Sequence, residues 1–338
     1  MFFVSVDGGA TKTVAVCYDS QGHVLGVGVG GPSNFRNVGV EEAKANVVEG
    51  VFACLRRAAL RIGEVERVTF ALAGVKDSAK STAMVDGFVR ELGLNKPYTL
   101  LNDGEAGFNC RFFRRDGVIV AAGTGMVAYA RVGGVMKRSS GWGWLIGDEG
   151  GAFYIGRRAL QLAAKLADGR VEEQTRLLEA VERFFSVDDP RRIVDEVYTA
   201  PLNIRRIALL AREVSSLARL GDQTAKNLIV EAAHEAALNI IALKKGFPGH
   251  NLPVSGYGGV FMAGQPYWET IKRDVEAVYP GTEYLKPLYG YHAVLGSIYM
   301  TLEEMGVKDF SEEEILREFE KKIEDLPIDE KRRYLLMD

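Results

Sequence analysis

The chain has 338 residues, of which 47% are hydrophobic and 26% charged, a balance typical of a globular protein with about two domains. Its 42 basic and 45 acidic residues give a net charge of −3, which argues against a protein dominated by nucleic-acid or membrane electrostatics. Three cysteines without a CxxC pair and four scattered histidines argue against a disulfide scaffold or a zinc site. The start, MFFVSVDGG, lacks the basic region of a signal peptide, so we expect a cytoplasmic protein that does not bind nucleic acid or membranes.

The N-terminal part of the chain predicts strands that alternate with helices. Three short runs rich in β-branched and aromatic residues, FFVSV, TVAVCY and HVLGVGV, predict three strands before residue 31. A helix at about 40–61, a buried strand at 68–74, a helix at 78–92 and a strand at 98–103 follow. This order indicates an α/β fold with a partly parallel sheet.

The pattern then starts again. We expect strands at 117–123, at 126–132 and in GGVMKRS, mostly helices over 152–246, a strand near 252–255, a helix at 264–278, a strand near 283–287 and a helix at 290–305. The junctions VDGGATKTVAVCY and AAGTGMVAYARV resemble each other, which suggests an internal duplication. We therefore expect one domain over 1–112 and a second, with a helical insertion, over 113–307. The tail, 308–338, begins a charged helix at Ser311, and its candidate packing partner is the first domain.

Two Gly-rich turns are candidate phosphate-binding loops. In DGGATKT (7–13) the turn leaves backbone amides bare, Lys12 can neutralise a phosphate, and Asp7 can hold a hydrated Mg²⁺. The alternative is a plain hairpin turn, in which Gly and Asp are common. AGTGM (122–126) is a second turn of the same type. Two such turns in a duplicated fold can clamp a polyphosphate.

The common nucleotide motifs do not explain the chain. It contains no GxxxxGK[ST] loop. Gly26, Gly28 and Gly31 match GxGxxG, but Pro32-Ser33-Asn34 stands where the helix of a dinucleotide fold should begin. This match therefore does not indicate a dinucleotide site.

Several polar residues lie at the ends of predicted elements. Asp103 closes the strand LLND, where a carboxylate can accept a hydroxyl proton from a substrate; the alternative is that Asp103 caps a turn or the next helix. Asp148 and Glu149 can hydrogen-bond sugar hydroxyls, with Trp142 or Trp144 as an apolar wall, or they can cap the helix at 152–167.

Two loops carry the same ambiguity. Asn34 in GPSNF is a polar loop residue that can bind a ligand or serve the turn. Gly256, Gly258 and Gly259 can let the backbone approach a flat ligand such as adenine, or they can meet the packing needs of a helix start.

The motifs DGGATKT, LLND, AAGTGM, GWGWLIGDEGG and SGYGGVF occur in the order seen in the actin/hexokinase/Hsp70-like ATPase superfamily. More narrowly, over about residues 3–305 the chain resembles the BadF/BadG/BcrA/BcrD-type ATPase family, which includes N-acetylglucosamine kinase and archaeal hexokinase. The resemblance implies two ribonuclease-H-like domains with ATP and substrate in the cleft between them. It also implies a homodimeric ATP-dependent kinase acting on the 6-hydroxyl of glucosamine, N-acetylglucosamine or glucose.

The resemblance also implies site residues. Asp103 matches the general base, and Asp7 would lie near Mg²⁺. The phosphate loops match Gly8, Gly9, Thr11 and Lys12 in the first turn and Gly123, Thr124 and Gly125 in the second. Gly258 and Gly259 match the adenosine motif, and Asn34, Asp103, Asp148 and Glu149 match sugar-contacting positions.

The chain departs from the family pattern in two places. Met126 and Val127 replace the Ser-Asn that follows the second loop in mammalian-type N-acetylglucosamine kinases, which puts strict N-acetylglucosamine specificity in doubt, and Tyr291 stands where a small residue is common. A rival function is that of ATPase activators of radical dehydratases or reductases, whose iron–sulfur cluster needs a cysteine before the second loop. Here that residue is Ala122. A non-catalytic sugar- or nucleotide-binding protein is the third possibility, against which Asp103 argues.

Overall fold

The computed structural model describes residues 1–73, 75, 78–199 and 202–335, except for the side chains of Arg36 and Asn37. Chain contacts divide it into two compact units, of which unit 1 comprises Met1–Arg114 and Tyr291–Asp338 and unit 2 comprises Arg115–Gly290. Unlike the predicted domain 113–307, unit 2 ends at Gly290, so the helix predicted at 290–305 belongs to unit 1. No helix in the described part of the chain is both long and apolar enough to cross a bilayer.

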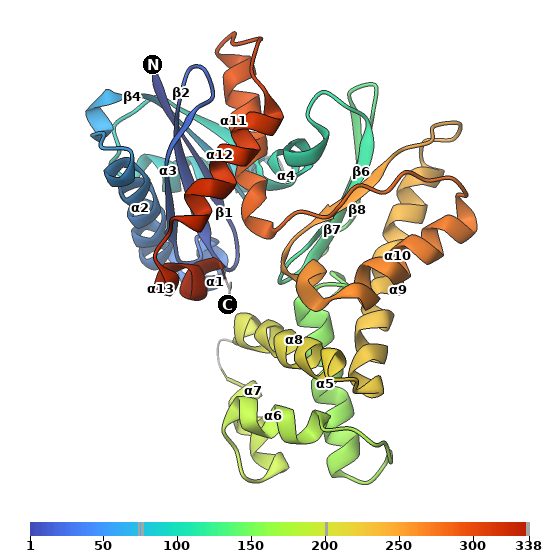
Figure 1. The fold of residues 1–338 in the computed structure, drawn as a ribbon. Coiled ribbons are helices and arrows are strands. Elements are labelled where there is room, and N and C mark those ends of the chain that lie inside the picture. The colour runs from blue at the N-terminus through green and yellow to red at the C-terminus, as the bar shows by residue number, and fades with distance from the viewer. Residues whose placement is uncertain (74, 76–77, 200–201, 336–338) are drawn as a thin grey trace. The chain divides into compact units, whose positions relative to one another are not determined.

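Unit 1 is built on a five-stranded sheet (Figure 1) with the order β3-β2-β1-β4-β5. Its strands are β1 (Phe2–Gly8), β2 (Thr13–Asp19), β3 (Val24–Gly30), β4 (Val65–Leu72) and β5 (Tyr98–Asn102). The first three strands are antiparallel neighbours, whereas β4 and β5 run parallel to β1. The predicted α/β fold with a partly parallel sheet is thus confirmed, although Gly74, at the end of one predicted strand, lies outside the described residues.

Helices cover both faces of this sheet. Apart from those of the C-terminal tail, the described α-helices of this unit are α1 (Phe35–Val38), α2 (Val40–Arg57), α3 (Ala79–Arg90), α4 (Asp103–Phe112) and α11 (Ala293–Glu304). Side chains alternate along β1, so Val4 and Val6 join the apolar core with α2 and α3. On the opposite face Thr69 of β4 hydrogen-bonds Thr301 of α11 at 2.7 Å. Helix α4 was not predicted, because its residues are buried nearly all round and show no amphipathic stripe.

The C-terminal tail packs on unit 1 through α12 (Glu312–Glu324) and α13 (Ile328–Glu330). A Glu318 carboxylate accepts the backbone N–H of Val24 on the edge strand β3 at 2.7 Å, and Glu330 pairs with Arg57 of α2 at 2.6 Å. Ser311 caps α12 by accepting the backbone N–H of Glu314, as the sequence predicts. The tail therefore covers an otherwise open sheet edge.

Unit 2 repeats the order of the first four strands in the sheet of unit 1, β3-β2-β1-β4. Its sheet, in the order β8-β7-β6-β9, comprises β6 (Gly117–Ala122), β7 (Met126–Val132), β8 (Val135–Ser140) and β9 (Val254–Tyr257). The last of these is parallel to β6, as β4 is to β1. Instead of the strand predicted near 283–287, only single bridges at Tyr284 and Leu288 continue the sheet. The matching order supports the predicted duplication.

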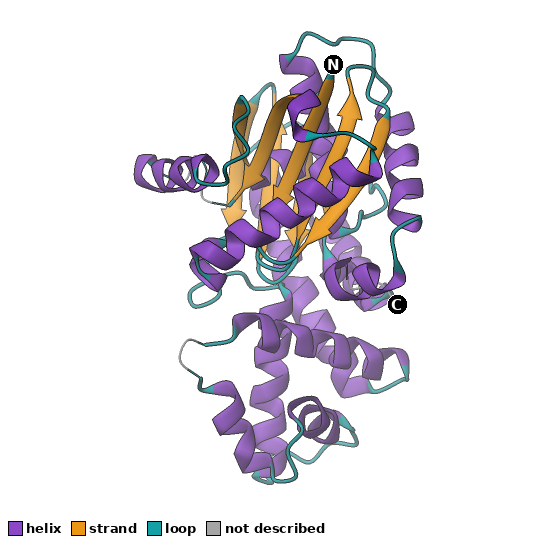
Figure 2. Cartoon of the chain, turned by 90° about the vertical axis from the view of Figure 1, so that its left-hand side faces the viewer, coloured by secondary structure: helices purple, strands orange, loops and turns teal. Residues whose placement is uncertain are grey.

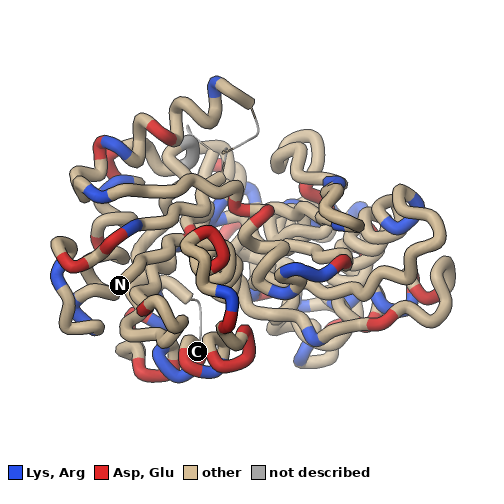
Figure 3. Tube along the Cα trace, turned by 90° about the horizontal axis from the view of Figure 1, so that it is seen from above, with Lys and Arg blue, Asp and Glu red and all other residues tan. Residues whose placement is uncertain are grey.

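In the described part of 152–246 all the regular elements are helices (Figure 2). The α-helices are α5 (Ala152–Ala167), α6 (Leu177–Phe185), α7 (Ile193–Val197), α8 (Ile204–Arg219) and α9 (Gln223–Lys245), with a short 3-10 helix at Pro190–Arg192, and α10 (Gln265–Val278) follows β9. Helix α9 packs on the sheet and on α10. Acidic and basic residues are interspersed along both units (Figure 3), in keeping with the small net charge.

Candidate active site

The first Gly-rich turn joins β1 to β2 in unit 1. Gly8 and Thr13 are the last pair of the two strands, and Gly9 N–H donates to the Lys12 carbonyl at 3.0 Å to close the turn. The candidate residues Gly8, Gly9, Thr11 and Lys12 therefore lie together at one end of the sheet. Asp7 points to the opposite face from Val6 and Gly8, because side chains alternate along a strand.

Asp103 lies at the same end of the sheet, because β1, β4 and β5 are parallel and their carboxyl ends lie together. Asn102, and not Asp103, is the N-cap of α4, and it accepts the backbone N–H groups of Gly104 and Glu105 at 3.0 and 3.2 Å. The interpretation of Asp103 as the cap is therefore wrong. Asp103 itself accepts from Gly104 at 3.0 Å, at the positive end of the helix dipole.

Asp7, Lys12 and Asp103 form an electrostatic cluster. Desolvation, and then the charge of Asp103, raise the pKa of Asp7 to about 7, against the lowering influence of Lys12. Desolvation also lowers the pKa of Lys12, and Asp7 opposes that effect. Carboxylate oxygens are the ligands that Mg²⁺ prefers, and a cation beside Asp7 would relieve the repulsion between the two carboxylates. The residues present therefore fit a magnesium ion held by Asp7 through water.

Asn34 lies beside this turn as well. Its backbone N–H and that of Ser33 both donate to the Gly9 carbonyl, at 3.2 and 3.0 Å. In contrast, Gly26 and Gly28 lie inside β3 against the backbone of α2: a Cβ atom at Gly28 would come within 2.0 Å of the Gly50 carbonyl oxygen. The GxGxxG match therefore reflects close packing of a strand on a helix.

The second Gly-rich turn joins β6 to β7 in unit 2. Gly123 N–H donates to the Gly125 carbonyl at 3.0 Å. The carbonyls of Gly123 and Thr124 accept the N–H groups of Ala152 and Phe153, at 2.8 and 2.9 Å, in the first turn of α5. The turn therefore rests on the N-terminus of that helix.

Asp148 lies against this second turn. Its Oδ1 accepts Gly143 N–H at 3.0 Å, and a Cβ atom at Gly125 would lie 2.1 Å from its Oδ2. Desolvation raises the pKa of Asp148, Gly143 N–H lowers it and Glu149 raises it further. The N-cap of α5 is Gly151, with no side-chain bond, so the interpretation of Asp148 and Glu149 as caps is wrong.

The two tryptophans of this loop differ in their surroundings. Trp144 packs its ring on Phe153 with centroids 5.3 Å apart, whereas Trp142 is 68% exposed. Of the two predicted apolar walls, Trp142 is therefore the more exposed, while Trp144 is partly covered by Phe153.

The predicted adenosine motif follows β9. Gly258 has φ 125° and lies against β6, since a Cβ atom there would stand 2.2 Å from the Ala122 carbonyl oxygen. A short 3-10 helix spans Gly259–Ala263. Gly258 therefore meets a packing need, as the alternative interpretation holds, while the space beside Gly259 is open.

Cys17, Cys54 and Cys110 are buried free thiols in unit 1. Burial raises the pKa of Cys17 to about 12, so this thiol is not a ready metal ligand. Across the described residues no group of three or more His, Cys, Asp or Glu side chains is arranged to hold a metal ion.

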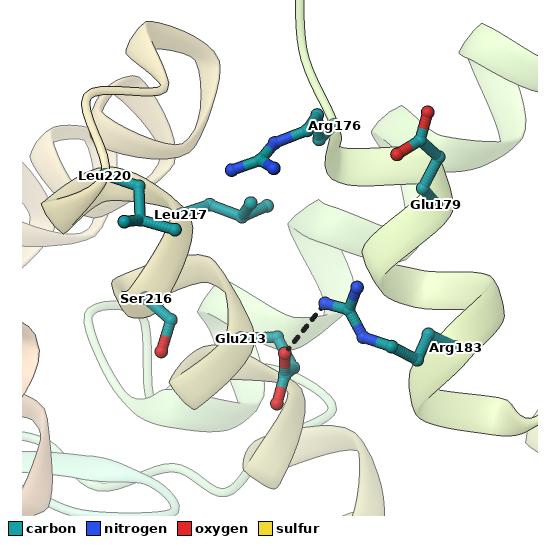
Figure 4. Close-up of a pocket in the computed structure, with 7 residues that line it drawn as sticks. All are labelled: Arg176, Glu179, Arg183, Glu213, Ser216, Leu217 and Leu220. Carbon is teal, nitrogen blue, oxygen red and sulfur yellow. Dashed lines mark hydrogen bonds and ion pairs between the residues drawn. The ribbon is translucent and has the colours of Figure 1, made fainter.

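A surface pocket lies between α6 and α8 (Figure 4) and contains no residue of the predicted site. Arg183 and Glu213 pair across it at 3.5 Å. Its lining residues are Arg176, Glu179, Arg183, Glu213, Ser216, Leu217 and Leu220.

Sequence reasoning missed two residues at the first turn. Thr13 Oγ1 donates to the Gly31 carbonyl at 2.8 Å, and Asn46 Nδ2 donates to the Pro32 carbonyl at 2.7 Å. Thr13 belongs to the DGGATKT motif, but Asn46 lies in α2 and carries no local signal.

The comparisons with known proteins agree on one family. The profile of the BadF/BadG/BcrA/BcrD ATPase family matches residues 4–300. The N-acetylmuramic acid/N-acetylglucosamine kinase of Clostridium acetobutylicum is 30% identical over 72% of this chain and 79% of its own length. The N-acetyl-D-glucosamine kinase of Dictyostelium discoideum is 29% identical over 69% of this chain and 76% of its own length.

A solved structure supports the fold. A proposed N-acetylglucosamine kinase from Chromobacterium violaceum has a TM-score of 0.69 and 24% identity, covering 89% of this chain and 98% of its own. At this identity the match shows the fold alone. It confirms the α/β fold that the motifs predict.

Proposed function

Because this chain belongs to the BadF/BadG/BcrA/BcrD ATPase family, we propose that it is an ATP-dependent kinase of amino sugars. The observation that carries the proposal is the cluster of Asp7, Lys12 and Asp103 at a Gly-rich turn. Phosphoryl transfer needs charge stabilisation and a positioned base more than it needs covalent chemistry, and we assign the first to Lys12 and the second to Asp103.

The phosphate groups of ATP are assigned to the two Gly-rich turns. Gly8, Gly9 and Thr11 supply the first turn and Lys12 supplies a positive charge, while Gly123, Thr124 and Gly125 supply the second. Backbone N–H groups fixed in place stabilise negative charge without reorganisation during the reaction. Gly258 and Gly259 are assigned to the adenosine.

Asp103 is the proposed general base. Its carboxylate takes the proton of the sugar 6-hydroxyl as the oxygen attacks the γ-phosphorus, and the bond from that phosphorus to the bridging oxygen of ADP breaks. A Mg²⁺ ion, held through water by Asp7, would offset the charge of the phosphates. Asn34, Asp148 and Glu149 are assigned to the sugar hydroxyls.

The sugar class follows from the relatives, two of which are named as kinases of N-acetylated amino sugars. Glucosamine and glucose stay in the proposal, because Met126 and Val127 replace the polar pair expected after the second turn. We further propose that the protein has two domains and forms a homodimer in the cytoplasm. Gel filtration with light scattering tests the oligomeric state.

The function is tested by sugar-dependent ADP release from purified protein with Mg²⁺ and ATP. We expect release with at least one of N-acetylglucosamine, N-acetylmuramic acid, glucosamine and glucose, and none with the 6-deoxy form of the preferred sugar. Full activity with the 6-deoxy sugar would move the reaction to another hydroxyl. No release with any sugar, together with iron and sulfide in anaerobically purified protein, would favour the dehydratase-activator function.

A further inference from the structure

We propose that Thr13 and Asn46 are positioning residues that hold the segment Gly31–Asn34 against the first Gly-rich turn, and that this link couples sugar binding to nucleotide binding. The inference rests on the proposed function, because it assigns phosphate to the turn and sugar to Asn34. All the contacts involved lie within unit 1.

Each residue of the segment is tied by its backbone. The Gly31 carbonyl accepts from Thr13 Oγ1 at 2.8 Å, and the Pro32 carbonyl accepts from Asn46 Nδ2 at 2.7 Å. Ser33 N–H and Asn34 N–H both donate to the carbonyl of Gly9, at 3.0 and 3.2 Å. The segment is therefore fastened to the turn, to the first residue of β2 and to α2.

Packing fixes the spacing between the segment and the turn. Ser33 is 3% exposed, and a Cβ atom at Gly8 would lie 2.3 Å from its Oγ. Likewise, a Cβ atom at Gly31 would come within 2.7 Å of the Asn46 amide oxygen. Neither contact leaves room for the segment to move closer, and the hydrogen bonds oppose its moving away.

The shared carbonyl makes this a link and not only a support. The Gly9 C=O and the Ala10 N–H belong to one planar trans peptide, so they point in opposite directions. With the C=O held by Ser33 and Asn34, the Ala10 N–H points away from the segment, and we assign this N–H to the phosphate. Phosphate that fixes the Ala10 N–H thereby also fixes the acceptor of Asn34, and sugar that fixes Asn34 does the reverse, as linkage requires.

Thr13 is the residue to change, because it is completely buried and its hydroxyl makes one identified bond to the segment. Thr13→Val removes the donor and keeps the shape, and Thr13→Ser keeps the donor. Asn46→Leu breaks the second tie from a different element. Thr69→Val is the matched control, since it removes a buried strand hydroxyl that bonds Thr301 on the other face of the sheet.

The readout is the dissociation constant of the preferred sugar, measured by calorimetry with and without the β,γ-imido analogue of ATP, alongside kcat and both KM values. In the wild type we expect the analogue to tighten sugar binding. We call the ratio of the sugar dissociation constants without and with the analogue the coupling factor. In Thr13→Val and Asn46→Leu we expect the coupling factor to fall toward one. The sugar KM should rise about tenfold, or about 1.4 kcal/mol, with a smaller change in kcat. Thr13→Ser should restore the factor, and Thr69→Val should keep it even where it lowers the melting temperature.

The inference is overturned if the analogue does not tighten sugar binding in the wild type. It is also overturned if Thr13→Val and Asn46→Leu have the same coupling factor and the same KM values as the control Thr69→Val. The proposed function fails separately, by the absence of sugar-dependent ADP release from the wild type. If the wild type turns over sugar and both variants keep its coupling factor, the proposed coupling through Thr13 and Asn46 is wrong and the proposed kinase function stands.

Discussion

The Oδ2 atom of Asp148 lies so close to Gly125 that a Cβ atom on Gly125 would stand only 2.1 Å from it. Asp148, a proposed sugar-binding residue, is thus in contact with the second Gly-rich turn, a proposed phosphate-binding loop, within unit 2. Asp148 has φ 61°, a left-handed conformation that glycine, asparagine and aspartate adopt more readily than other residues. Its side chain is further held by Gly143 N–H, so the contact is fixed from two sides.

Gly125→Ala should therefore displace Asp148 and lower the free energy of unfolding by about 1–3 kcal/mol. Chemical denaturation measures this. Gly123→Ala is the control, because a Cβ atom there meets no atom within 4 Å.

A double-mutant cycle identifies the partner. Asp148→Gly suits the positive φ and removes the clashing oxygen, so Gly125→Ala should cost less in that background than in the wild type. Equal costs in the two backgrounds would show that Asp148 is not what Gly125 accommodates.

The positions of both Gly-rich turns could be predicted from the sequence, because each turn lies between two strands with strong apolar patterns. The predicted strand at 126–132 matches β7 to the residue, whereas Asp103, expected as the last residue of a strand, is the first residue of α4, directly after β5 ends at Asn102. The tie from Asn46 to Pro32 could not be predicted, since it joins a helix to a loop through one side-chain amide. Nor does the sequence reveal that Asn102 caps α4, because Asn and Asp suit that position equally well.

Asp7 should make stability depend on pH. Its pKa is about 7 in the folded protein and 3.8 ordinarily, so ionisation is harder in the folded state. The contribution of Asp7 to the free energy of unfolding is favourable below about pH 4. It is lost as the pH rises to about 7, at no more than about 1.4 kcal/mol per pH unit.

Thermal unfolding of Asp7→Asn beside the wild type, without nucleotide or Mg²⁺, measures this effect. The melting temperature of the variant relative to that of the wild type should rise steadily from pH 4 to pH 7 and stay constant from pH 7 to pH 8. A difference between the two proteins that does not change with pH would mean that Asp7 is not strained by its surroundings.

The tail should contribute to the stability of unit 1. Phe319 of α12 is 0% exposed, so Phe319→Ala leaves a cavity and should lower the free energy of unfolding by about 3–5 kcal/mol. Phe52→Ala is the matched control on α2, because Phe52 is 38% exposed. Similar losses in the two variants, measured by urea denaturation, would contradict the packing of the tail.

Asp103 carries the central claim, that this chain transfers phosphate to a sugar with a carboxylate as base. Asp103→Asn removes the base and keeps the shape, whereas Glu105→Gln removes a carboxylate two residues further along the same helix, α4. The direct measurement is sugar-dependent ADP release by both variants and the wild type, with ATP affinity measured in parallel. We predict a loss in kcat of about 100-fold or more for Asp103→Asn with ATP affinity retained, and near wild-type turnover for Glu105→Gln. Wild-type turnover in Asp103→Asn would contradict the account.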